Sequence, residues 1–396
     1  MGVATTLAAA VEPFVGGDLP VRLRAWDGSE AGPADAPLVV LDSPRAVRRL
    51  LWHPGELGAA QAYVTGELDV PGDLDSALTH AFAVARDRGL PRRPAPGAVL
   101  RALRAARSVG ALGAPPRAPR SQVGAVRDHY DLSNEFYELI LDRSMAYSCG
   151  YFATPSTTLA EAQTAKLDLV CAKLGLEPGM RLLDVGCGWG SLSLHAAEHH
   201  GAQVVGVTIS AQQQAFVEKR AADRGLADRV TVRLQDYRDV PETGFDAVGS
   251  LEMGEHVGER HYPAYAAALQ RAVRPGGRVL VQQMSRPGRR GGRHPGGGPF
   301  IEAFIAPDMH MRPLGETVAY LEGGGLEVRH VQALREHYVR TVAGWLERLE
   351  ANVDRLTELV GEETVRVWRL YLVGGSMAFR DGRMGVDQIL MERTGD

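Results

Sequence analysis

The sequence contains little cysteine and little lysine. Its three cysteines, Cys149, Cys171 and Cys187, form no pair at the spacing of a metal site and are too few for a disulfide framework. This pattern is typical of a protein from a reducing cytoplasm. Lysine occurs only at positions 166, 173 and 219, whereas arginine is abundant. We interpret this bias as a sign of a GC-rich bacterial genome, which says little about function.

Long apolar runs are also missing. No run reaches the roughly 18 residues that a membrane-spanning helix requires. The segment Met1–Ala10 has no basic residue ahead of its apolar stretch, so it does not resemble a signal peptide. The net charge of −4 excludes a generally basic nucleic-acid binder. With 396 residues and 45% hydrophobic content, the chain can bury a large core, and we expect two domains.

One glycine-rich run organises the rest of the chain: Asp184-Val185-Gly186-Cys187-Gly188-Trp189-Gly190. A short buried strand, Arg181–Val185, is predicted before it and a helix, Ser191–His200, after it. Glycines let the backbone turn tightly and approach a ligand, and the helix N-terminus offers free N–H groups. The spacing Gly-x-Gly-x-Gly is not that of the dinucleotide motif. With Asp184 in front, it resembles the first motif of class I S-adenosylmethionine-dependent methyltransferases.

Composition divides the chain into three parts. Residues 1–90 alternate short strands with helices and are predicted to form a small α+β accessory domain for lipid binding or dimerisation. Residues 91–121 are rich in Pro, Ala and Arg and are predicted to be a linker that contains a helix. In that helix Arg101, Arg104 and Arg107 form a basic stripe. The stripe is either the solvated face of a linker helix or a surface that contacts anionic lipid headgroups.

Residues 122–396 are predicted to form the catalytic domain. Strands are expected at Arg181–Val185, Gln203–Ile209, Val230–Gln235, Phe245–Leu251 and Arg278–Met284. Their alternation with helices predicts an α/β fold with a doubly wound, mainly parallel sheet. The resemblance of the glycine run implies that this is the Rossmann-like class I methyltransferase fold. The segment 286–299 is dense in Gly, Arg and Pro and is expected to be a loop near the entrance of the site.

Four further stretches sharpen the comparison. They comprise 127–137 with 145–152, then 207–213, 235–238 and 252–258. With the glycine run, and in this order and spacing, they resemble the cyclopropane-fatty-acid synthase family. That family includes the mycolic acid cyclopropane synthases and the actinobacterial fatty-acid methyltransferases. The resemblance extends from about Leu57 to Trp345.

The resemblance implies that S-adenosylmethionine is the methyl donor. Behind Asp184, the three glycines Gly186, Gly188 and Gly190 would hold the amino-acid part of this cofactor. A generic methyltransferase binds the ribose with an acidic residue at the end of its second strand, where this chain has Thr208. The resemblance assigns Thr208 and Gln213 to the ribose, Asp236, Tyr237 and Arg238 to the adenine, and Tyr147 and Ser148 to the methionine carboxylate. An ordinary half-buried tyrosine is the alternative interpretation of Tyr147.

The substrate that the family implies is an alkene, which is a weak and neutral nucleophile. The enzyme must hold the double bond in line with the methyl–sulfonium bond in a dry pocket. Attack leaves a carbocation, which needs π faces or anions nearby and then a base. In the family this base is thought to be a bound bicarbonate ion.

By the same resemblance, Cys149, Glu255 and Tyr338 match the bicarbonate ligands of the family. Because a carboxylate repels an anion, Glu255 is expected to be protonated or to share a proton with the ion. The alternative interpretation of Cys149 is a thiol that is simply packed in the core. For His256, a structural histidine is favoured over a base.

One departure from the family concerns the strand after the Pro-Gly-Gly turn. Where the cyclopropane synthases typically carry His and, two residues later, Ile, this chain has Gln282 and Met284. Glutamine hydrogen-bonds an anion but cannot accept a proton, which puts the bicarbonate site or the fate of the cation in doubt. Proton loss from the new methyl group gives a cyclopropane, whereas a prior hydride shift gives a methylene branch. The divergent pocket favours the methylene product of the actinobacterial relatives, and cyclopropanation is the alternative.

The predicted function is therefore methylation of an unsaturated acyl chain, of the oleoyl type, in membrane phospholipid, giving a 10-methylene product. We expect a cytoplasmic enzyme that is peripheral to the inner face of the membrane and forms a homodimer through its N-terminal domain. A separate reductase would complete the methyl branch, because the chain has one nucleotide motif. No metal and no nucleic acid are expected. An alternative from another class is a catalytically silent subunit that binds lipid or S-adenosylmethionine.

Overall fold

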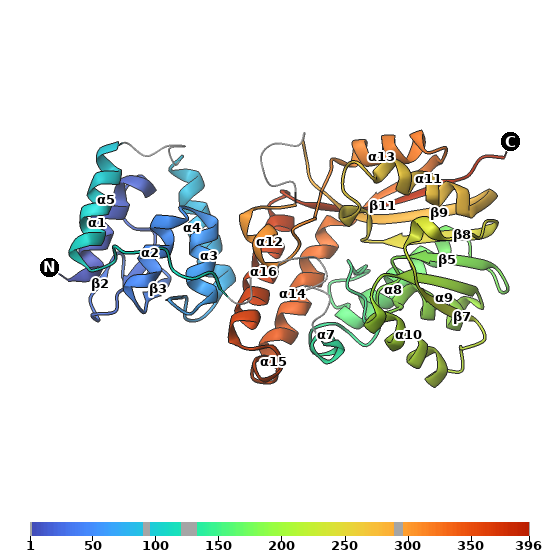
Figure 1. Cartoon of the computed structure of the whole chain (residues 1–396), viewed down its shortest axis with the longest axis horizontal. Coiled ribbons are helices and arrows are strands. Elements are labelled where there is room, and N and C mark those ends of the chain that lie inside the picture. The colour runs from blue at the N-terminus through green and yellow to red at the C-terminus, as the bar shows by residue number, and fades with distance from the viewer. Residues whose placement is uncertain (1, 90–95, 120–132, 289–295, 396) are drawn as a thin grey trace. The chain divides into compact units, whose positions relative to one another are not determined.

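The computed structural model describes residues 2–89, 96–119, 133–288 and 296–395. The chain divides into two units, which we call unit 1 (residues 1–122 with 361–377) and unit 2 (residues 123–360 with 378–396). Figure 1 labels their elements. The first part of the motif that begins at residue 127, and the centre of the predicted loop over 286–299, lie outside the described residues.

Unit 1 contains mostly helices beside a small sheet. Its elements are α1 (Val3–Val15), β1 (Arg22–Arg24), β2 (Glu30–Ala31), β3 (Leu38–Leu41), α2 (Pro44–Trp52), α3 (Glu56–Val64), β4 (Leu68–Asp69), α4 (Leu74–Asp87), α5 (Pro96–Ser108) and most of α16 (Glu362–Arg380). The strand order is β2-β1-β3-β4, and β1 pairs with β3 in parallel. The core of unit 1 includes Leu7, Leu23 and Leu41. The apolar run 38–41 forms β3, one of the short strands expected within residues 1–90.

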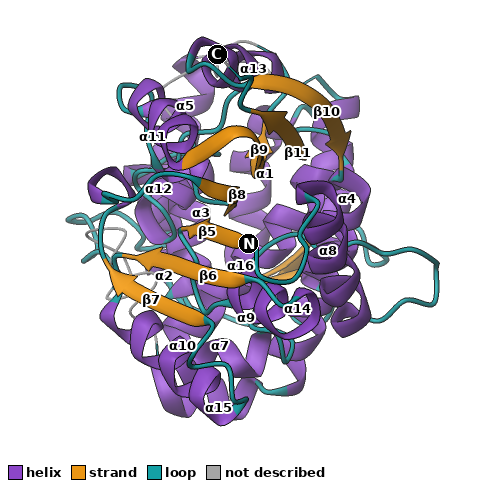
Figure 2. Ribbon diagram, turned by 90° about the vertical axis from the view of Figure 1, so that its right-hand side faces the viewer, coloured by secondary structure: helices purple, strands orange, loops and turns teal. Residues whose placement is uncertain are grey.

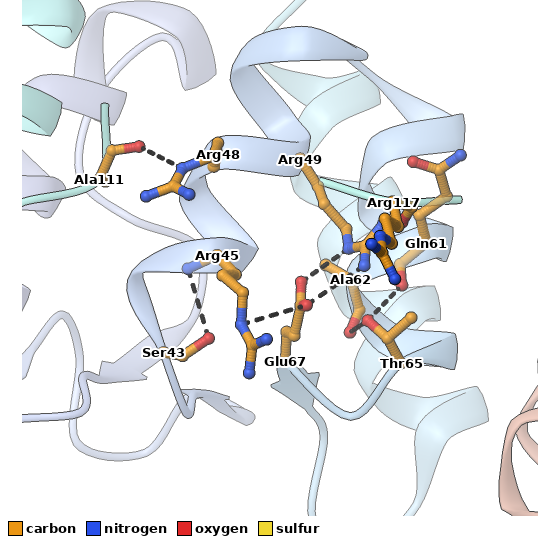
Figure 3. A network of polar contacts seen from close by, with 10 residues as sticks. All are labelled: Ser43, Arg45, Arg48, Arg49, Gln61, Ala62, Thr65, Glu67, Ala111 and Arg117. Carbon is orange, nitrogen blue, oxygen red and sulfur yellow. Dashed lines mark hydrogen bonds and ion pairs between the residues drawn. The ribbon is translucent and has the colours of Figure 1, made fainter. Parts of the chain in front are cut away.

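A buried ion pair joins α2 to Glu67, the residue directly before β4 (Figure 3). The Arg49 guanidinium binds both carboxylate oxygens of Glu67, at 2.6 and 3.2 Å, and the two side chains are only 5% and 8% exposed. Arg49 also donates to the backbone carbonyl of Arg117 at 2.9 Å. Arg45 reaches the same carboxylate at 3.6 Å but is 66% exposed. Because Arg49 is withdrawn from water, its charge depends on Glu67.

The boundary of unit 1 differs from the predicted one in two places. Helix α5, which the composition placed in a linker, packs against α1. Residues 361–377, which were assigned to the catalytic domain, belong to unit 1. There the Arg366 guanidinium donates to the carbonyl oxygens of Tyr63 and Leu68 and to the carboxylate of Asp69, at 2.6 to 3.0 Å. Contacts between residues about 300 positions apart leave no sign in local composition.

Unit 2 is an α/β structure. Its elements are α7 (Asn134–Ile140), α8 (Leu159–Leu174), β5 (Arg181–Val185), α9 (Ser191–His200), β6 (Gln203–Thr208), α10 (Ala211–Asp223), β7 (Val230–Leu234), η1 (Tyr237–Asp239), β8 (Phe245–Leu251), η2 (Gly254–His256), α11 (Tyr262–Ala272), β9 (Val273–Ser285), α12 (Pro299–Phe304), α13 (Leu314–Gly323), β10 (Glu327–Ala333), α14 (Arg335–Ala351), α15 (Val353–Val360) and β11 (Gly385–Glu392). The end of α16 also belongs to this unit.

The sheet of unit 2 has the strand order β10-β11-β9-β8-β5-β6-β7, and Figure 2 shows it as one twisted layer. The strands β5 to β9 are parallel, and β11 and β10 join antiparallel at one edge. Successive residues of β5 enter opposite cores: Leu182 packs with α8, α9 and α10, and Leu183 packs with α11. The predicted fold class, a doubly wound and mainly parallel sheet, is confirmed.

The buried ion pair of unit 1 gives a stability prediction. We expect Glu67→Gln to lower the free energy of unfolding by about 3 kcal/mol, because it leaves the Arg49 charge buried without a counter-charge. Arg45→Gln is the matched control. Its exposed contact with the same carboxylate predicts a change of less than about 1 kcal/mol. Urea unfolding of the full chain measures both, and equal effects of the two variants would contradict the assignment.

Candidate active site

A glycine turn joins β5 to α9. Gly186, Gly188 and Gly190 have φ angles of 76°, 53° and 76°, in the left-handed region that glycine adopts without steric cost. A Cβ atom on Gly190 would lie 2.6 Å from Cγ1 of Val217, whereas a Cβ atom on Gly188 would meet no atom within 4 Å. Gly190 is therefore required for packing against α10. Gly188 faces open space that a ligand can enter.

Asp184 anchors the turn to the helix that follows it. Its buried carboxylate accepts a hydrogen bond of 2.7 Å from the Ser193 hydroxyl in the first turn of α9. Burial raises the pKa of Asp184 to about 6. The helix α9 begins after Gly190, which has no side chain to cap it. The first N–H groups of α9 consequently remain for a ligand, and the positive end of the helix dipole suits an anionic group.

Two other groups of predicted cofactor residues follow the neighbouring strands. At the end of β6, the buried side chains of Thr208 and Gln213 share a hydrogen bond of 2.7 Å. After β7, the Asp236 carboxylate binds the Arg238 guanidinium through hydrogen bonds of 2.7 and 2.9 Å. The Tyr237 ring between them meets Tyr265 edge-on. Because β5, β6 and β7 are parallel, these residues lie along the same edge of the sheet as the glycine turn.

The predicted pair Tyr147 and Ser148 lies before α8. The Tyr147 ring packs on Trp345 with the ring centroids 5.2 Å apart. The Ser148 hydroxyl accepts a hydrogen bond of 2.8 Å from the ammonium of Lys166, which is fully buried. Burial lowers the pKa of Lys166. The sequence analysis missed this lysine, and a cation at this place suits the carboxylate of an amino-acid ligand.

The chemistry of the site centres on Glu252, the first residue after β8. Its Oε1 accepts hydrogen bonds from the Cys149 backbone N–H and from the Gln282 side-chain amide, both 2.8 Å long. Its Oε2 accepts a hydrogen bond of 2.5 Å from the Tyr338 hydroxyl. Burial raises the pKa of Glu252, and these three hydrogen bonds act in the opposite direction. The structure thus brings together the predicted residues Cys149, Gln282 and Tyr338, around a carboxylate that was not predicted.

A relay of side chains fixes the orientation of the Gln282 amide. The Lys173 ammonium, which has donors only, binds Oε1 of Gln388 at 2.7 Å. Gln388 must therefore donate from Nε2, and it does so to Oε1 of Gln282 at 2.9 Å. The Gln282 amide group is left with its N–H groups toward Glu252. This assignment leaves no freedom for a flipped amide.

Cys149 takes part through its backbone and not through its thiol. The buried thiol points to the carbonyl oxygens of Gly150 and Leu334, at 3.3 and 3.6 Å. Burial, and then the nearby charge of Glu252, raises the pKa of this thiol. A neutral thiol is therefore present, consistent with the packed-thiol interpretation of this side chain.

Glu255 and His256 lie beside this cluster and not within it. Glu255 is 0% exposed, receives a long N–H contact of 3.5 Å from Met284, and has one oxygen with no hydrogen-bond partner among the described residues. Burial, and then repulsion by Glu252, raises the pKa of Glu255. Nδ1 of His256 lies 3.5 Å from the Asp308 carboxylate. The structure places neither residue in a hydrogen bond with Cys149, Gln282 or Tyr338 within the described parts of the chain.

Glu252 had a signal in the sequence that was not used. An acidic residue directly after a predicted parallel strand, Phe245–Leu251, stands at the edge of the sheet where α/β enzymes bind ligands. Neither Lys173 nor Gln388 directly follows a predicted strand. Lys173 lies on α8, and Gln388 lies on β11, a strand that was not predicted.

A separate set of potential ligand atoms lies on α8 and α9. The thiol of Cys171 and the imidazole nitrogens of His195 and His200 lie within 4.8 Å of one another. A hydrogen bond of 2.7 Å joins His195 to the Asp168 carboxylate. The sequence analysis looked for metal sites in the spacing of the cysteines and expected none. Such spacing cannot reveal a cluster of one cysteine and two histidines.

The residues present fit S-adenosylmethionine but not bicarbonate. Open space at Gly188, the uncapped start of α9 and the buried Lys166 together form a place for an amino-acid group with its carboxylate. The donors expected to hold bicarbonate are instead bound to Glu252. A second anion among them would be repelled by this carboxylate.

The glycine turn provides a binding test. We expect Gly188→Ala to weaken S-adenosylmethionine binding by at least about tenfold, or about 1.4 kcal/mol, because the new methyl group enters the open space. The left-handed φ should also cost about 1 kcal/mol of stability. Gly179→Ala is the control, since Gly179 has a φ of 84°, has no atom near its Cβ position and lies before β5. Calorimetry with thermal unfolding separates the two effects. Equal affinity losses in both variants would refute the assignment.

Three known proteins are similar to this chain over most of its length. A protein of Pseudomonas putida named "Probable fatty acid methyltransferase" is 38% identical over 384 residues, which cover 94% of this chain and 91% of that protein. The tuberculostearic acid methyltransferase UfaA1 of Mycobacterium tuberculosis is 35% identical over 391 residues, or 95% of this chain and 88% of that protein. The crystal structure of the mycolic acid cyclopropane synthase CmaA1 with SAH and CTAB has a TM-score of 0.63 and 33% identity. It covers 69% of this chain and 98% of CmaA1.

The match to a family model is more direct still. The model described as mycolic acid cyclopropane synthetase matches residues 117–389, which include the glycine turn and the whole Glu252 cluster. The family resemblance that the sequence motifs indicated is thereby confirmed. This chain belongs to the mycolic acid cyclopropane synthetase family of S-adenosylmethionine-dependent enzymes.

Proposed function

We propose that this enzyme transfers a methyl group from S-adenosylmethionine to the double bond of an unsaturated fatty acyl chain. The observation that carries the proposal is a hydrogen-bonded carboxylate, Glu252, beside packed aromatic rings. The Tyr338 ring meets Trp345 edge-on at 5.9 Å, and Trp345 packs on Tyr147 at 5.2 Å. Attack by an alkene leaves positive charge on carbon, which aromatic faces and an anion stabilise. A methyltransferase that acts on an amine needs no such surroundings, because the lone pair of the amine nitrogen has only to be aligned with the methyl group.

The cofactor supplies an electrophilic methyl group when it is bound. The glycine turn and the start of α9 would hold its amino-acid part, with Lys166 and Ser148 at the carboxylate. Thr208 and Gln213 would contact the ribose, and the segment 236–238 the adenine. SAH in the CmaA1 structure supports this choice of cofactor. What remains for the rest of the site is to exclude water, orient the alkene and accept a proton.

The choice of acyl chain rests on which relatives match the whole protein. The Pseudomonas putida protein and UfaA1 match 94% and 95% of the chain. The first is named a probable fatty acid methyltransferase and the second a tuberculostearic acid methyltransferase. The cyclopropane synthase CmaA1 matches 69%. We therefore propose a fatty acyl substrate of the oleoyl type, carried on phospholipid, with a 10-methylene product. A cyclopropane product is the second candidate, because CmaA1 shares the fold of the site.

We propose that the enzyme is cytoplasmic and binds the inner face of the membrane through α5. Ala98 and Ala106 are buried in unit 1, whereas the larger Val99, Leu100 and Leu103 are 41–49% exposed. The side chains of the basic stripe at 101, 104 and 107 are exposed as well. Exposed apolar and basic side chains on one helix suit an anionic lipid surface. Among the described residues, no helix is long and apolar enough to cross a membrane.

We propose that a pocket of unit 2 binds an anionic lipid headgroup. Its volume is about 490 Å³, and it lies where β9 ends and β11 begins. Arg286, Arg335 and Arg380 are part of its wall, together with the carboxylates Asp381 and Asp387. Guanidinium groups bind phosphate well because they offer several N–H donors in a plane.

Three partner proposals follow from the methylene product and from the family. A separate reductase would saturate the methylene branch, since the sequence contains one nucleotide-binding motif, the glycine run 184–190. A second copy of the chain would bind through unit 1 to form a homodimer. Nucleic acid is not a partner, given a net charge of −4.

The reaction is tested by the fatty acids of a host that expresses the protein and is supplied with oleate. We expect a mass gain of one CH₂ with a double bond that hydrogenation still reduces, because the hydride shift precedes proton loss. Gas chromatography with mass spectrometry of the methyl esters distinguishes this product from a ring. A gain without a reducible double bond would establish cyclopropanation. No gain, with intact S-adenosylmethionine binding, would instead support a catalytically silent subunit.

The membrane proposal is tested by flotation with vesicles of anionic phospholipid. We expect the triple variant Arg101→Gln, Arg104→Gln, Arg107→Gln to bind less, by about 1 kcal/mol for each charge removed. A variant with Lys219, Arg224 and Arg229 changed to Gln removes the same charge from unit 2 and should bind normally. Binding that is equally weak in both variants would show that net charge, and not α5, is responsible.

A further inference from the structure

We propose that the side chain of Glu252 is the resident base of this enzyme and takes the role that the family resemblance assigns to bicarbonate. The inference deepens the proposed function and rests on it. Its starting point is one observation. The donors that the family resemblance leads us to expect around bicarbonate bind the Glu252 carboxylate in this chain.

The first argument is the direction of the hydrogen bonds. The Cys149 backbone N–H, the Gln282 amide and the Tyr338 hydroxyl come from a loop, a strand and a helix, and all three donate to Glu252. These are donors that an oxyanion needs, and a carboxylate has the same planar pair of oxygens as bicarbonate. Bicarbonate could enter only if these bonds broke and two like charges came into contact.

The second argument is that the structure holds this carboxylate in place at some cost. Glu252 has a φ of 53°, and it and Met145 are the non-glycine residues with positive φ in the described parts of the chain. Its backbone N–H donates to the carbonyl oxygen of Gln282 at 2.6 Å, so Gln282 holds both ends of the residue. An unfavourable backbone conformation that neighbours stabilise on both sides is typical of functional positions.

The third argument is access. Glu255, the other carboxylate of this stretch, is 0% exposed, whereas Glu252 keeps part of its surface accessible. A base must reach the proton that it removes. Of these two carboxylates, Glu252 therefore meets the requirement.

The fourth argument is the count of lone pairs. A carboxylate can accept about four hydrogen bonds. Oε1 of Glu252 already accepts two, from Cys149 and Gln282, and Oε2 accepts one, from Tyr338. One lone pair remains on Oε2, and burial makes it more basic because it raises the pKa of the carboxyl group. The structure thus leaves one position at which a proton can be taken up.

The reaction balances with this base. The π electrons of the alkene form the new carbon–carbon bond to the methyl group, and the methyl–sulfur bond breaks with its electrons left on sulfur. The positive charge is then on the substrate. For the methylene product, a hydride first shifts from the methylated carbon to the cationic carbon, and a C–H bond of the new methyl group then breaks with its electrons forming the double bond. For the ring product no hydride shifts, and the electrons of the methyl C–H bond form the bond to the cationic carbon. In both cases the proton goes to Oε2 of Glu252. Transfer of this proton to solvent restores the carboxylate.

The test uses the full-length enzyme in buffer freed of carbon dioxide, with product formation measured with and without added bicarbonate. The wild type should turn over equally in both. Glu252→Gln should bind S-adenosylmethionine within about threefold of the wild type but lose turnover by at least about 100-fold, because an amide cannot take the proton. Glu177→Gln removes an exposed carboxylate before β5 and should leave turnover unchanged.

A second variant separates the base from a structural role. Glu252→Gly is compatible with the positive φ and leaves three donors around the space of a carboxylate. Added bicarbonate or formate should restore its turnover in a saturable manner, which a merely structural loss would not allow. Wild-type turnover that requires bicarbonate, or a Glu252→Gln variant as active as the wild type, would overturn the inference and leave the proposed function intact. A wild type without product under both conditions would overturn both.

Discussion

A carboxylate that leaves water must find hydrogen-bond donors, and unit 2 is arranged so that Glu252 finds three. These donors lie 103 residues before it and 30 and 86 residues after it in the sequence. They meet only when the sheet has closed from β8 to β11 and α14 has packed over its edge. Burying a charged group without such partners is strongly unfavourable. The position of this one carboxylate therefore depends on contacts between the loop that carries Cys149, strand β9 and helix α14.

The same neighbourhood combines groups that oppose one another electrostatically. Glu252 raises the pKa of Glu255, and Lys166 is a buried cation that favours the charged form of Glu252. The aromatic rings of Tyr147, Trp345 and Tyr338 add polarisable surface without adding charge. A site built in this way suits a reaction in which positive charge arises briefly on a neutral substrate.

Much of the fold could be predicted from the sequence, because the central strands are short apolar runs between clear turns. The predicted strands Arg181–Val185 and Phe245–Leu251 coincide with β5 and β8. Two strands of unit 2 were not predicted, for physical reasons. β10 is largely exposed, and β11 buries the polar side chains of Asp387 and Gln388, which pair with Ser285 and Gln282. Polar residues with long-range partners resemble a loop when only the local pattern is considered.

The site residues divide in the same way. The glycine turn, Thr208 and the segment 236–238 could be located because each follows a recognisable strand. Glu252 was passed over in favour of Glu255, which the family resemblance supplied. Only the three-dimensional structure shows which of two carboxylates three residues apart faces Cys149, Gln282 and Tyr338.

The membership of α16 in unit 1 has a consequence for how this protein is made. A ribosome releases residues 1–122 long before residues 361–377, so the first unit emerges without the helix that carries Arg366. The Arg366 guanidinium is therefore absent while most of the α/β unit is synthesised. During that time it cannot bind the carbonyl groups of Tyr63 and Leu68 or the carboxylate of Asp69. Unit 1 therefore cannot complete its hydrogen bonding until residues 361–377 have been synthesised, after most of unit 2.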